Sequence, residues 1–467
     1  MTTPAIDGPL AIVERRLADW PTRVRDAATT PRLSGDAIRQ RLAKYDFRAP
    51  HALDLLLTDV VSLLEQGTVH STHPRYFGLF NPGVLPAGVA ADGLAALYNP
   101  QVGAWWHAPA ANEIERLTLA FFQERLGIAG PDASATFTTG GSEANLTGVL
   151  AALTRGFPTF IDDGVRSLDR QPVLYVSDQA HDSFVKIAGM TGLGRSSVRR
   201  VASDVRHRID PEALRRSIAA DRASDRAPFL LVGTAGTTGT GAIDPLNELA
   251  TICWEEGLWY HVDAAWGGLA ALSDALRPLL TGIERADSVT LDAHKVLPVP
   301  MGAGMFFSRL CTPLEAAFAV HTGYVPDREP GTSDAYQYTV QWSRRFIGLK
   351  VFVTLAELGA DGVAALVEHQ TAMGDLLRAG ITRAGWRLMN DSRLPLVCFI
   401  PDAGASPAAI ARAVSDEGAV WLSELRLTDG TSALRACITH HETGPGDVEA
   451  LLKAVARAAK EPAPHKA

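Results

Sequence analysis

Three short apolar runs determine the fold, and each is followed at once by a polar or glycine-rich segment: FLLVGT (229–234), LWYHV (258–262) and SVTL (288–291). Those segments are AGTTGTGAID, DAAWGG and DAHK. Helix-patterned sequence separates the runs, as in Pro245–Glu256. Alternation of short apolar strands with helices predicts a mostly parallel sheet covered by helices, which is an α/β fold.

A fourth run, VLYVS (173–177), is followed by DQAHDS in the same way. Ligands of open α/β sheets bind at the carboxyl ends of the strands. We therefore expect one crevice that contains His181, Thr238, Asp263, His294 and Lys295. The alternative is that glycine, aspartate and threonine only form turns at these places. Four such segments in one chain favour the crevice.

The regions on either side of this sheet have different patterns. One apolar stripe near the N-terminus, with the three- and four-residue spacing of a helix, consists of Leu53, Leu56, Leu57, Val60, Leu63 and Leu64. The segment from about Gly362 onward begins with helix-like sequence, and strand candidates follow at Leu396–Ile400 and Leu434–Ile438. We expect an N-terminal helical segment (1–86), a large domain (87–361) and a small C-terminal α+β domain (362–467).

Composition excludes several classes of protein. Hydrophobic residues make up 46% of the 467 residues, which is enough for a core, and 44 basic against 52 acidic residues give a net charge of −8. An acidic chain is a poor dedicated nucleic-acid binder. The four cysteines form no CxxC motif, which argues against a disulfide scaffold or a thiolate zinc site.

Charged residues also interrupt the apolar runs. Glu14 and two arginines lie where a signal peptide needs an apolar segment, and no run reaches the 18 or so residues that span a bilayer. We expect a cytoplasmic protein without a membrane partner. The pair His440-His441 lies in the turn-like THHETGPGD (439–447), where we expect both rings to be solvated.

The segment TTGGSEANL (138–146) precedes an amphipathic helix. Glycines at a helix N-terminus let backbone N–H groups approach an anion, and a phosphate is the natural ligand. The segment matches neither GxGxxG nor a P-loop. The alternative is an ordinary helix start.

Three side chains in the expected crevice suggest a more specific chemistry. Lys295 has apolar flanks, which favour a lysine of lowered pKa suited to forming a Schiff base with an aldehyde; the alternative is a solvated surface lysine. Asp263 ends an apolar strand and would hold a protonated pyridine nitrogen, unless it only caps a helix. His181 would stack on that ring, unless it is an ordinary polar histidine. With a phosphate site, these groups describe pyridoxal 5′-phosphate as the cofactor.

The motifs TTGGSEAN, SDQAH, HVDAAWGG and DAHK occur in the order of one known family. Between about His73 and the helix after Arg345, the sequence resembles the pyridoxal-phosphate-dependent group II amino-acid decarboxylases. That family includes aromatic-amino-acid, histidine, glutamate, cysteine-sulfinate and diaminobutyrate decarboxylases. The resemblance implies an aspartate-aminotransferase-like type I fold. It also implies a homodimer with active sites at the interface and N-terminal helices that embrace the partner.

The resemblance also implies a role for each motif residue. Lys295 forms the Schiff base, Asp263 pairs with the pyridine nitrogen, and Ala265 packs beneath the ring. His181 stacks on the opposite face and helps to position the substrate carboxylate. The remaining cofactor contacts fall to Gly141, Ser142 and His294 at the phosphate, and to Thr238 beside the cofactor.

A loop with the sequence AVHTGYVPDREPGTSDAYQY (319–338) matches the mobile loop of the family. The resemblance implies that Tyr324 returns a proton to the α-carbon after carbon dioxide leaves, with Tyr336 and Tyr338 as fallback candidates. The expected reaction is decarboxylation of an L-amino acid to an amine. Alternatives are aldehyde-forming decarboxylation, another lyase or transaminase activity, and a non-catalytic protein of the same fold. Tyr324 argues against the aldehyde, and the pair of Lys295 and Asp263 argues against loss of catalysis.

The segments that line the substrate pocket in the family depart here from the aromatic-specific pattern. The corresponding positions include Phe80, Asn81, Gln101 and Gly103, and Trp106 adds aromatic surface with a possible reach into the partner's site. The HPRYF segment is closer to the glutamate and cysteine-sulfinate branch. This mixture suits a polar or medium-sized side chain and does not define the amino acid.

Overall fold

The structure is a computed structural model and describes residues 8, 10–320, 323, 330–401 and 406–460. Its larger sheet has seven strands in the order β2-β8-β7-β6-β5-β3-β4. These strands are β2 (Ser134–Thr138), β3 (Pro172–Ser177), β4 (Val198–Val201), β5 (Ala227–Thr234), β6 (Trp259–Asp263), β7 (Ser288–Asp292) and β8 (Gly304–Ser308). Strands β4, β3, β5, β6 and β7 pair in parallel, whereas β8 is antiparallel to both β7 and β2. The predicted mostly parallel sheet is confirmed.

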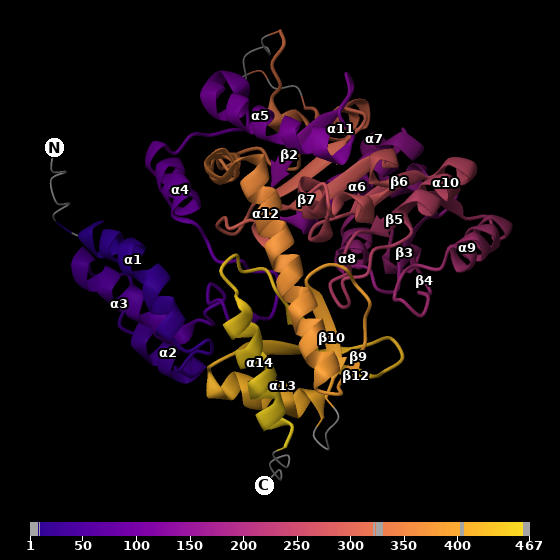
Figure 1. Ribbon diagram of the computed structural model, residues 1–467. Coiled ribbons are helices and arrows are strands. Elements are labelled where there is room, and N and C mark those ends of the chain that lie inside the picture. Colours follow the sequence, from indigo (N-terminus) through magenta and orange to yellow (C-terminus); the bar gives the residue numbers. More distant parts are fainter. Residues whose placement is uncertain (1–7, 9, 321–322, 324–329, 402–405, 461–467) are drawn as a thin grey trace.

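Helices cover both faces of this sheet (Figure 1). The described helices are α1 (Leu10–Arg23), α2 (Gly35–Leu42), α3 (Leu53–Gly67), α4 (Pro86–Tyr98), α5 (Pro109–Leu126), α6 (Gly141–Gly156), α7 (Phe160–Asp163), α8 (Ser183–Met190), α9 (Pro211–Ala223), α10 (Leu246–Glu256), α11 (Thr312–Phe318), α12 (Gly348–Arg383), α13 (Pro407–Glu417) and α14 (Pro445–Ala458). Along β5 the side chains alternate between two apolar clusters. Leu230 and Val232 pack with residues of α6 and α8, while Leu231 packs with residues of α5, α9 and α10. The sheet therefore lies between two cores, and its strand ends remain free for a site.

A second, smaller sheet has the order β1-β11-β12-β10-β9. Its strands are β1 (Tyr76–Phe77), β9 (Arg387–Leu388), β10 (Leu396–Ile400), β11 (Trp421–Arg426) and β12 (Ser432–Cys437). The two strands predicted near the C-terminus are β10 and β12, with β12 beginning and ending slightly earlier than expected. Strand β1 comes from the N-terminal region and pairs in parallel with β11.

Helix α12 connects the region of the large sheet to that of the small one (Figure 1). Its C-terminal half packs with the small sheet through Leu377 and Ile381. The helix contains a kink at Gly359, where φ is 64° and ψ is 173°. Only glycine adopts such angles readily, so this residue permits the change of direction.

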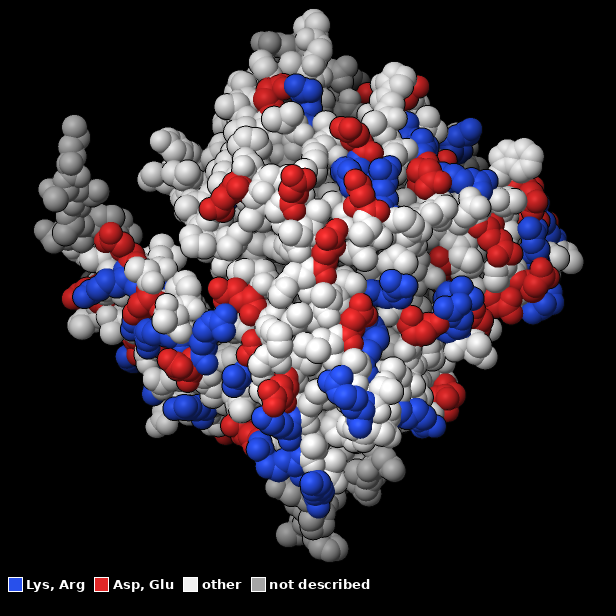
Figure 2. Space-filling view, viewed as in Figure 1, with Lys and Arg blue, Asp and Glu red and all other residues white. Residues whose placement is uncertain are grey.

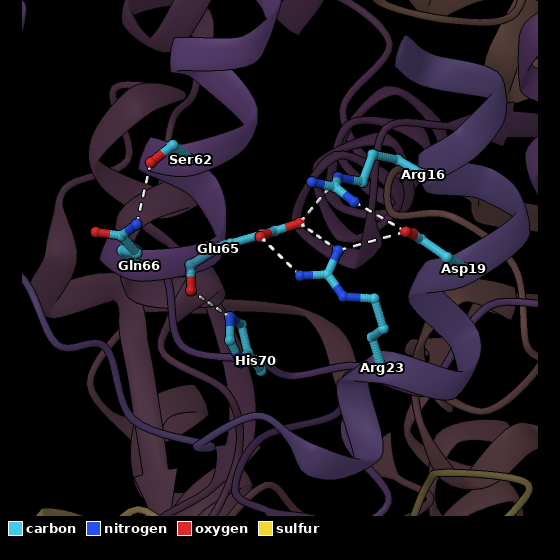
Figure 3. Close-up of polar contacts among 7 residues, drawn as sticks. All are labelled: Arg16, Asp19, Arg23, Ser62, Glu65, Gln66 and His70. Carbon is cyan, nitrogen blue, oxygen red and sulfur yellow. Dashed lines mark hydrogen bonds and ion pairs between the residues drawn. The ribbon is translucent and has the colours of Figure 1, made fainter. Parts of the chain in front are cut away.

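Helices α1, α2 and α3 form a group at one side of the molecule (Figure 1). The carboxylate of Glu65 on α3 lies 3.1 Å from Arg16 Nε and 3.4 Å from Arg23 Nη1, both on α1 (Figure 3). Asp19 accepts from the same two arginines and completes the cluster. The expected helix over the apolar stripe is present as α3, but none of its residues is buried within the chain.

The expectation of a solvated histidine pair is wrong for His440. This residue is only 4% exposed, and its Nε2 lies 2.9 Å from the carbonyl oxygen of Thr72. Thr443 Oγ1 also donates to the Pro74 carbonyl, so the N-terminal segment covers this turn. The ligand atoms of His440, His441 and Glu442 lie within 4.8 Å of one another. Both ring nitrogens of His440 are already engaged, because its Nδ1 accepts from the Glu442 N–H.

Basic and acidic side chains are interspersed on the face of the molecule shown in Figure 2. This face therefore has no broad surface of one sign. Among the helices of the described ranges, none combines the length and the hydropathy that a bilayer crossing needs.

Candidate active site

A cavity of about 400 Å³ opens at the carboxyl ends of β5, β6 and β7. The last residues of these strands are Thr234, Asp263 and Asp292, and all three line it. The rest of the lining consists of Phe80, Thr139, Gly140, Gly141, Ser142, Glu143, Asn145, His181, Gly236, Thr238, Ala265, Trp266, His294 and Lys295. The crevice expected from the strand ends is therefore present, and the predicted cofactor contacts meet in it.

Lys295 ends a short 3₁₀ turn, Ala293–Lys295, that follows β7 directly. Its Nζ lies 3.0 Å from Oδ2 of Asp292, whose side chain is 1% exposed. The apolar flanks of Lys295 in the sequence therefore do not mean that its amine lacks a charged neighbour, because Asp292 faces it across the turn. The other carboxylate oxygen of Asp292 is buried and has no hydrogen-bond partner in the described part of the chain.

No role was predicted for Asp292 from the sequence, although its position at the end of a strand could have predicted that it lies in the crevice. It ends β7 as Asp263 ends the neighbouring β6. Since parallel strands end at the same edge of a sheet, the two carboxylates had to lie in one crevice.

Asp263 is 4% exposed and both of its oxygens accept a hydrogen bond. Oδ2 accepts from Asn145 Nδ2 at 2.9 Å, and Oδ1 accepts from the Ala265 backbone N–H at 3.1 Å. Hydrogen bonds to an ionised carboxylate favour the charged form and fix its orientation. The geometry suits a carboxylate that holds a cation in the cavity.

The start of α6 forms a cradle for an anion. Gly141 begins the helix, and a Cβ at this position would lie 2.9 Å from Asp292 Oδ2 and 3.2 Å from the Ala265 Cβ. Only a glycine leaves this space open to a ligand. The N–H groups of the first helical turn and the helix dipole favour an anion there.

Two histidines line the cavity at different places. His294 is buried, and this burial lowers its pKa. Its Nδ1 accepts from the Ala303 N–H at 3.1 Å, so the neutral ring has its proton on Nε2 and can donate there. His181 is exposed, and its Nδ1 accepts from the Ser183 N–H at 3.2 Å. Each ring is therefore held in one orientation by a backbone donor.

One wall of the cavity is aromatic and has a cation behind it. The rings of Phe80 and Trp266 lie 4.7 Å apart between centroids, and the Arg435 guanidinium lies 5.1 Å from the Phe80 centroid. Arg435 comes from β12 and is 4% exposed. It donates to the carbonyls of Gly78 and Thr238, while its Nη2 is buried without a partner in the described chain. No pattern in the sequence links Arg435 to this wall, because the small sheet brings it there.

Most of the other residues predicted at the substrate pocket do not line this cavity. Phe80 lines the cavity, but Asn81, Gln101, Gly103 and Trp106 lie outside its lining within this chain. Tyr324 lies outside the described residues. The fallback tyrosines are buried away from the cavity: the Tyr336 N–H donates to the Gly103 carbonyl, and the Tyr338 hydroxyl donates to Glu315.

These groups fit pyridoxal 5′-phosphate. The cradle at Gly141 and the Nε2–H of His294 suit the phosphate, the Lys295 amine suits the aldehyde, and the Asp263 carboxylate suits the ring nitrogen. The fold and the cavity define the class of vitamin-B6-dependent enzymes with the type I fold.

Comparisons with known proteins identify the family within this class. The family model described as "Pyridoxal-dependent decarboxylase conserved domain" matches residues 39–401, so the chain belongs to that family. It is 30% identical over 407 residues to the aromatic-L-amino-acid decarboxylase of Bacillus atrophaeus, covering 84% of this chain and 82% of that one. It is 32% identical over 340 residues to the cysteine sulfinic acid decarboxylase of Mus musculus, covering 71% and 68%. The protein is a pyridoxal-phosphate-dependent amino-acid decarboxylase, and therefore a carboxy-lyase.

Solved structures show the same fold. The crystal structure of mouse CSAD in apo form has a TM-score of 0.88 at 24% identity and covers 97% of this chain and 99% of that one. The structure of Oryza sativa TDC with PLP and tryptamine has a TM-score of 0.90 at 21% identity, with coverage of 98% and 99%. The type I fold expected from the sequence is confirmed.

Proposed function

We propose that this protein decarboxylates an L-amino acid to the corresponding amine, with Lys295 as the residue that binds the cofactor covalently. The observation that supports this most directly is the presence of Lys295 Nζ and the Asp263 carboxylate in one cavity, at the ends of neighbouring strands. When bound, pyridoxal phosphate supplies an electron sink for the carbanion that remains after carbon dioxide leaves.

The side chains of this chain have distinct tasks in that reaction. With the cofactor bound, Asp263 would hold the positive charge of the ring nitrogen, and Ala265 would pack beneath the ring. The α6 N-terminus at Gly141 and Ser142 and the ring of His294 bind the phosphate, and Thr238 lies beside the cofactor. His181 would cover the opposite face of the ring and orient the substrate carboxylate. Orientation and fixed charges are the contribution of the protein to the rate.

The assignment of Lys295 can be tested directly. Holoenzyme is treated with borohydride, digested and analysed by mass spectrometry, and we expect the cofactor adduct on the Lys295 peptide alone. Lys295→Ala should abolish both the adduct and release of carbon dioxide, whereas the control Lys186→Ala, on α8, should retain both. An adduct on another peptide of fully loaded protein would refute the assignment.

The substrate that we propose has a polar side chain of medium size. The aromatic wall of Phe80 and Trp266 limits the space, and the buried Arg435 guanidinium behind Phe80 adds positive charge close to that wall, which favours an anionic side chain. The mouse relative named for cysteine sulfinic acid fits this choice. A panel that includes L-aspartate, L-glutamate, cysteine sulfinate and the aromatic amino acids should show the highest kcat/KM for an acidic member. Preference for L-tryptophan or L-phenylalanine would contradict this substrate class.

Tyr324 is proposed as the residue that returns the proton to the α-carbon. We expect Tyr324→Phe to lower amine output and to raise aldehyde and hydrogen peroxide, with consumption of oxygen. Tyr336→Phe is the control, because Tyr336 lies outside the cavity lining. Amine output that stays unchanged in Tyr324→Phe would show that another group donates the proton.

We also propose a homodimer, and a cytoplasmic location remains a prediction from the sequence. The support for the dimer is the exposed apolar surface of two helices: Leu53, Leu55, Val60 and Leu64 of α3, and Leu94, Leu97 and Tyr98 of α4. Surfaces of this kind mark protein contacts. A sedimentation mass of one subunit at micromolar concentration would contradict the dimer.

A further inference from the structure

Four buried side chains form a line that leads away from Asp263 and begins with Asn145 at the cavity wall. Asn145 of α6 donates to Asp263 Oδ2 at 2.9 Å, and its Oδ1 lies 3.1 Å from His261 Nε2. His261 Nδ1 lies 2.8 Å from the Ser288 hydroxyl, which lies 2.8 Å from the indole nitrogen of Trp259. The exposed fractions of Asn145, His261, Ser288 and Trp259 are 1%, 0%, 0% and 7%. The members of this line are therefore almost entirely removed from solvent.

The two ends of the line determine the direction of every hydrogen bond. The Trp259 indole can only donate, and an ionised Asp263 can only accept. Ser288 accepts from Trp259, so its own proton goes to His261 Nδ1. The neutral histidine then has its proton on Nε2 and donates to the Asn145 carbonyl oxygen, which leaves the Asn145 amide to donate to Asp263. Every donor along the line points toward Asp263.

The charge state of His261 agrees with this direction. Burial lowers its pKa to about 4, so the ring is neutral near pH 7 and has a single N–H. A protonated ring would donate from both nitrogens and leave the Ser288 proton without an acceptor in the line. The Thr290 hydroxyl, 3.3 Å from Nε2, can share the same proton and does not reverse the order.

The packing around His261 is specific for its ring. Phe306 stacks at 6.4 Å with an interplanar angle of 20°, and Phe184 meets the ring edge at 6.1 Å. Gly148, inside α6, provides the space, since a Cβ there would lie 2.9 Å from both Cε1 and Nδ1 of His261. Glycine weakens a helix interior, so its presence at this contact fits a requirement for the ring.

We propose that this one-way line of hydrogen bonds is a positioning device that keeps Asp263 ionised and aimed at the cofactor's ring nitrogen, with His261 as its central residue. The inference rests on the proposed function. Asp263 and the ring nitrogen compete for one proton, and hydrogen bonds to the carboxylate stabilise its charged form. Bonds in a buried chain polarise one another, so remote members contribute. The line thereby biases the proton toward the ring nitrogen, where it makes the cofactor a better electron sink.

The test uses holoenzyme reconstituted with cofactor labelled with ¹⁵N in the ring. In the wild type we expect the NMR resonance of a protonated ring nitrogen. His261→Phe and Ser288→Ala should move it toward the neutral-ring position, with a smaller movement in Trp259→Phe. The cofactor dissociation constant should rise about tenfold in His261→Phe, which corresponds to about 1.4 kcal/mol of lost binding.

The matched control is Tyr260→Phe. Tyr260 is the next residue on β6, is 2% exposed, and donates to the Leu246 carbonyl at 2.9 Å, outside the line. Its loss should leave the ¹⁵N resonance unchanged. If His261→Phe does not fold, the ¹⁵N resonance of Ser288→Ala tests the proposal, because that variant removes only a single oxygen.

The outcomes separate this inference from the proposed function. An unchanged ¹⁵N resonance in folded, loaded Ser288→Ala would overturn the inference, as would an equal movement in Tyr260→Phe. If instead the wild type forms no adduct at Lys295, the proposed function itself fails. An adduct in every variant together with a resonance that moves only in the line variants would support both.

Discussion

Gly141 lies where a single methyl group would close the anion cradle. A Cβ there would meet Asp292 Oδ2 at 2.9 Å, and this carboxylate is fixed by Lys295. We expect Gly141→Ala to raise the cofactor dissociation constant by about tenfold or more, since 1.4 kcal/mol of lost binding corresponds to tenfold. Titration of apoprotein with pyridoxal phosphate, followed by tryptophan fluorescence, measures it.

The control is Gly156→Ala at the other end of α6, where the nearest atom to a Cβ is 3.8 Å away. This variant should bind the cofactor as the wild type does. Equal affinity of Gly141→Ala and the wild type would show that the phosphate does not lie at the α6 N-terminus.

At the scale of the elements, the kink in α12 depends on the backbone conformation of a single residue, Gly359. Gly359 has φ 64° and ψ 173° at the kink, and no atom lies within 4 Å of a Cβ at this position. An alanine there meets no clash but has to adopt a strained backbone, so Gly359→Ala should reduce the free energy of unfolding by about 1–3 kcal/mol. Urea unfolding measures the change.

Gly446→Ala is the matched control, because Gly446 lies in α14 with the same open space and without a positive φ. It should leave stability unchanged or raise it by up to about 1 kcal/mol. If Gly359→Ala behaves like Gly446→Ala, the kink is not required. The domain limit at 361/362 stays a prediction, and it lies within α12, two residues after the kink at Gly359.

At the scale of the entire fold, three buried histidines make stability depend on pH. Burial lowers the pKa of His73 and His261 to about 4 and that of His440 to about 3, from 6.5. Between these values the unfolded chain binds protons that the folded chain does not. Stability therefore falls as pH decreases from 6.5 toward 4, by about 2 kcal/mol per histidine between pH 7 and pH 5.

Asp244 opposes this trend, because burial raises its pKa to about 7 and the folded protein takes up a proton there first. Its contribution offsets about one histidine, so these four groups together should lower stability by about 3 kcal/mol between pH 7 and pH 5. The urea midpoint of apoprotein at the two pH values tests this. Asp244→Asn should steepen the decrease, and a midpoint at pH 5 equal to that at pH 7 would refute it.

Much of the site could be predicted from local sequence. The apolar runs became β5, β6 and β7 with ends displaced by at most two residues, and the residues after them line one cavity. This worked because a parallel sheet places all its carboxyl strand ends at one edge, so short motifs that follow strands converge without further information. The burial of His440 was predicted wrongly, because its cover comes from a segment more than 360 residues earlier.

The order of strands and polar segments was enough to predict the α/β sheet and the cofactor, and to place Lys295 in the cavity, since each of these depends on short motifs that follow strands. Contacts between distant segments had to come from the folded chain. Asn145 and His261 meet behind Asp263, and Arg435 reaches Phe80 from the small sheet. Hydrophobic periodicity records which face of an element is buried and not what lies against it, so these partners are determined by packing.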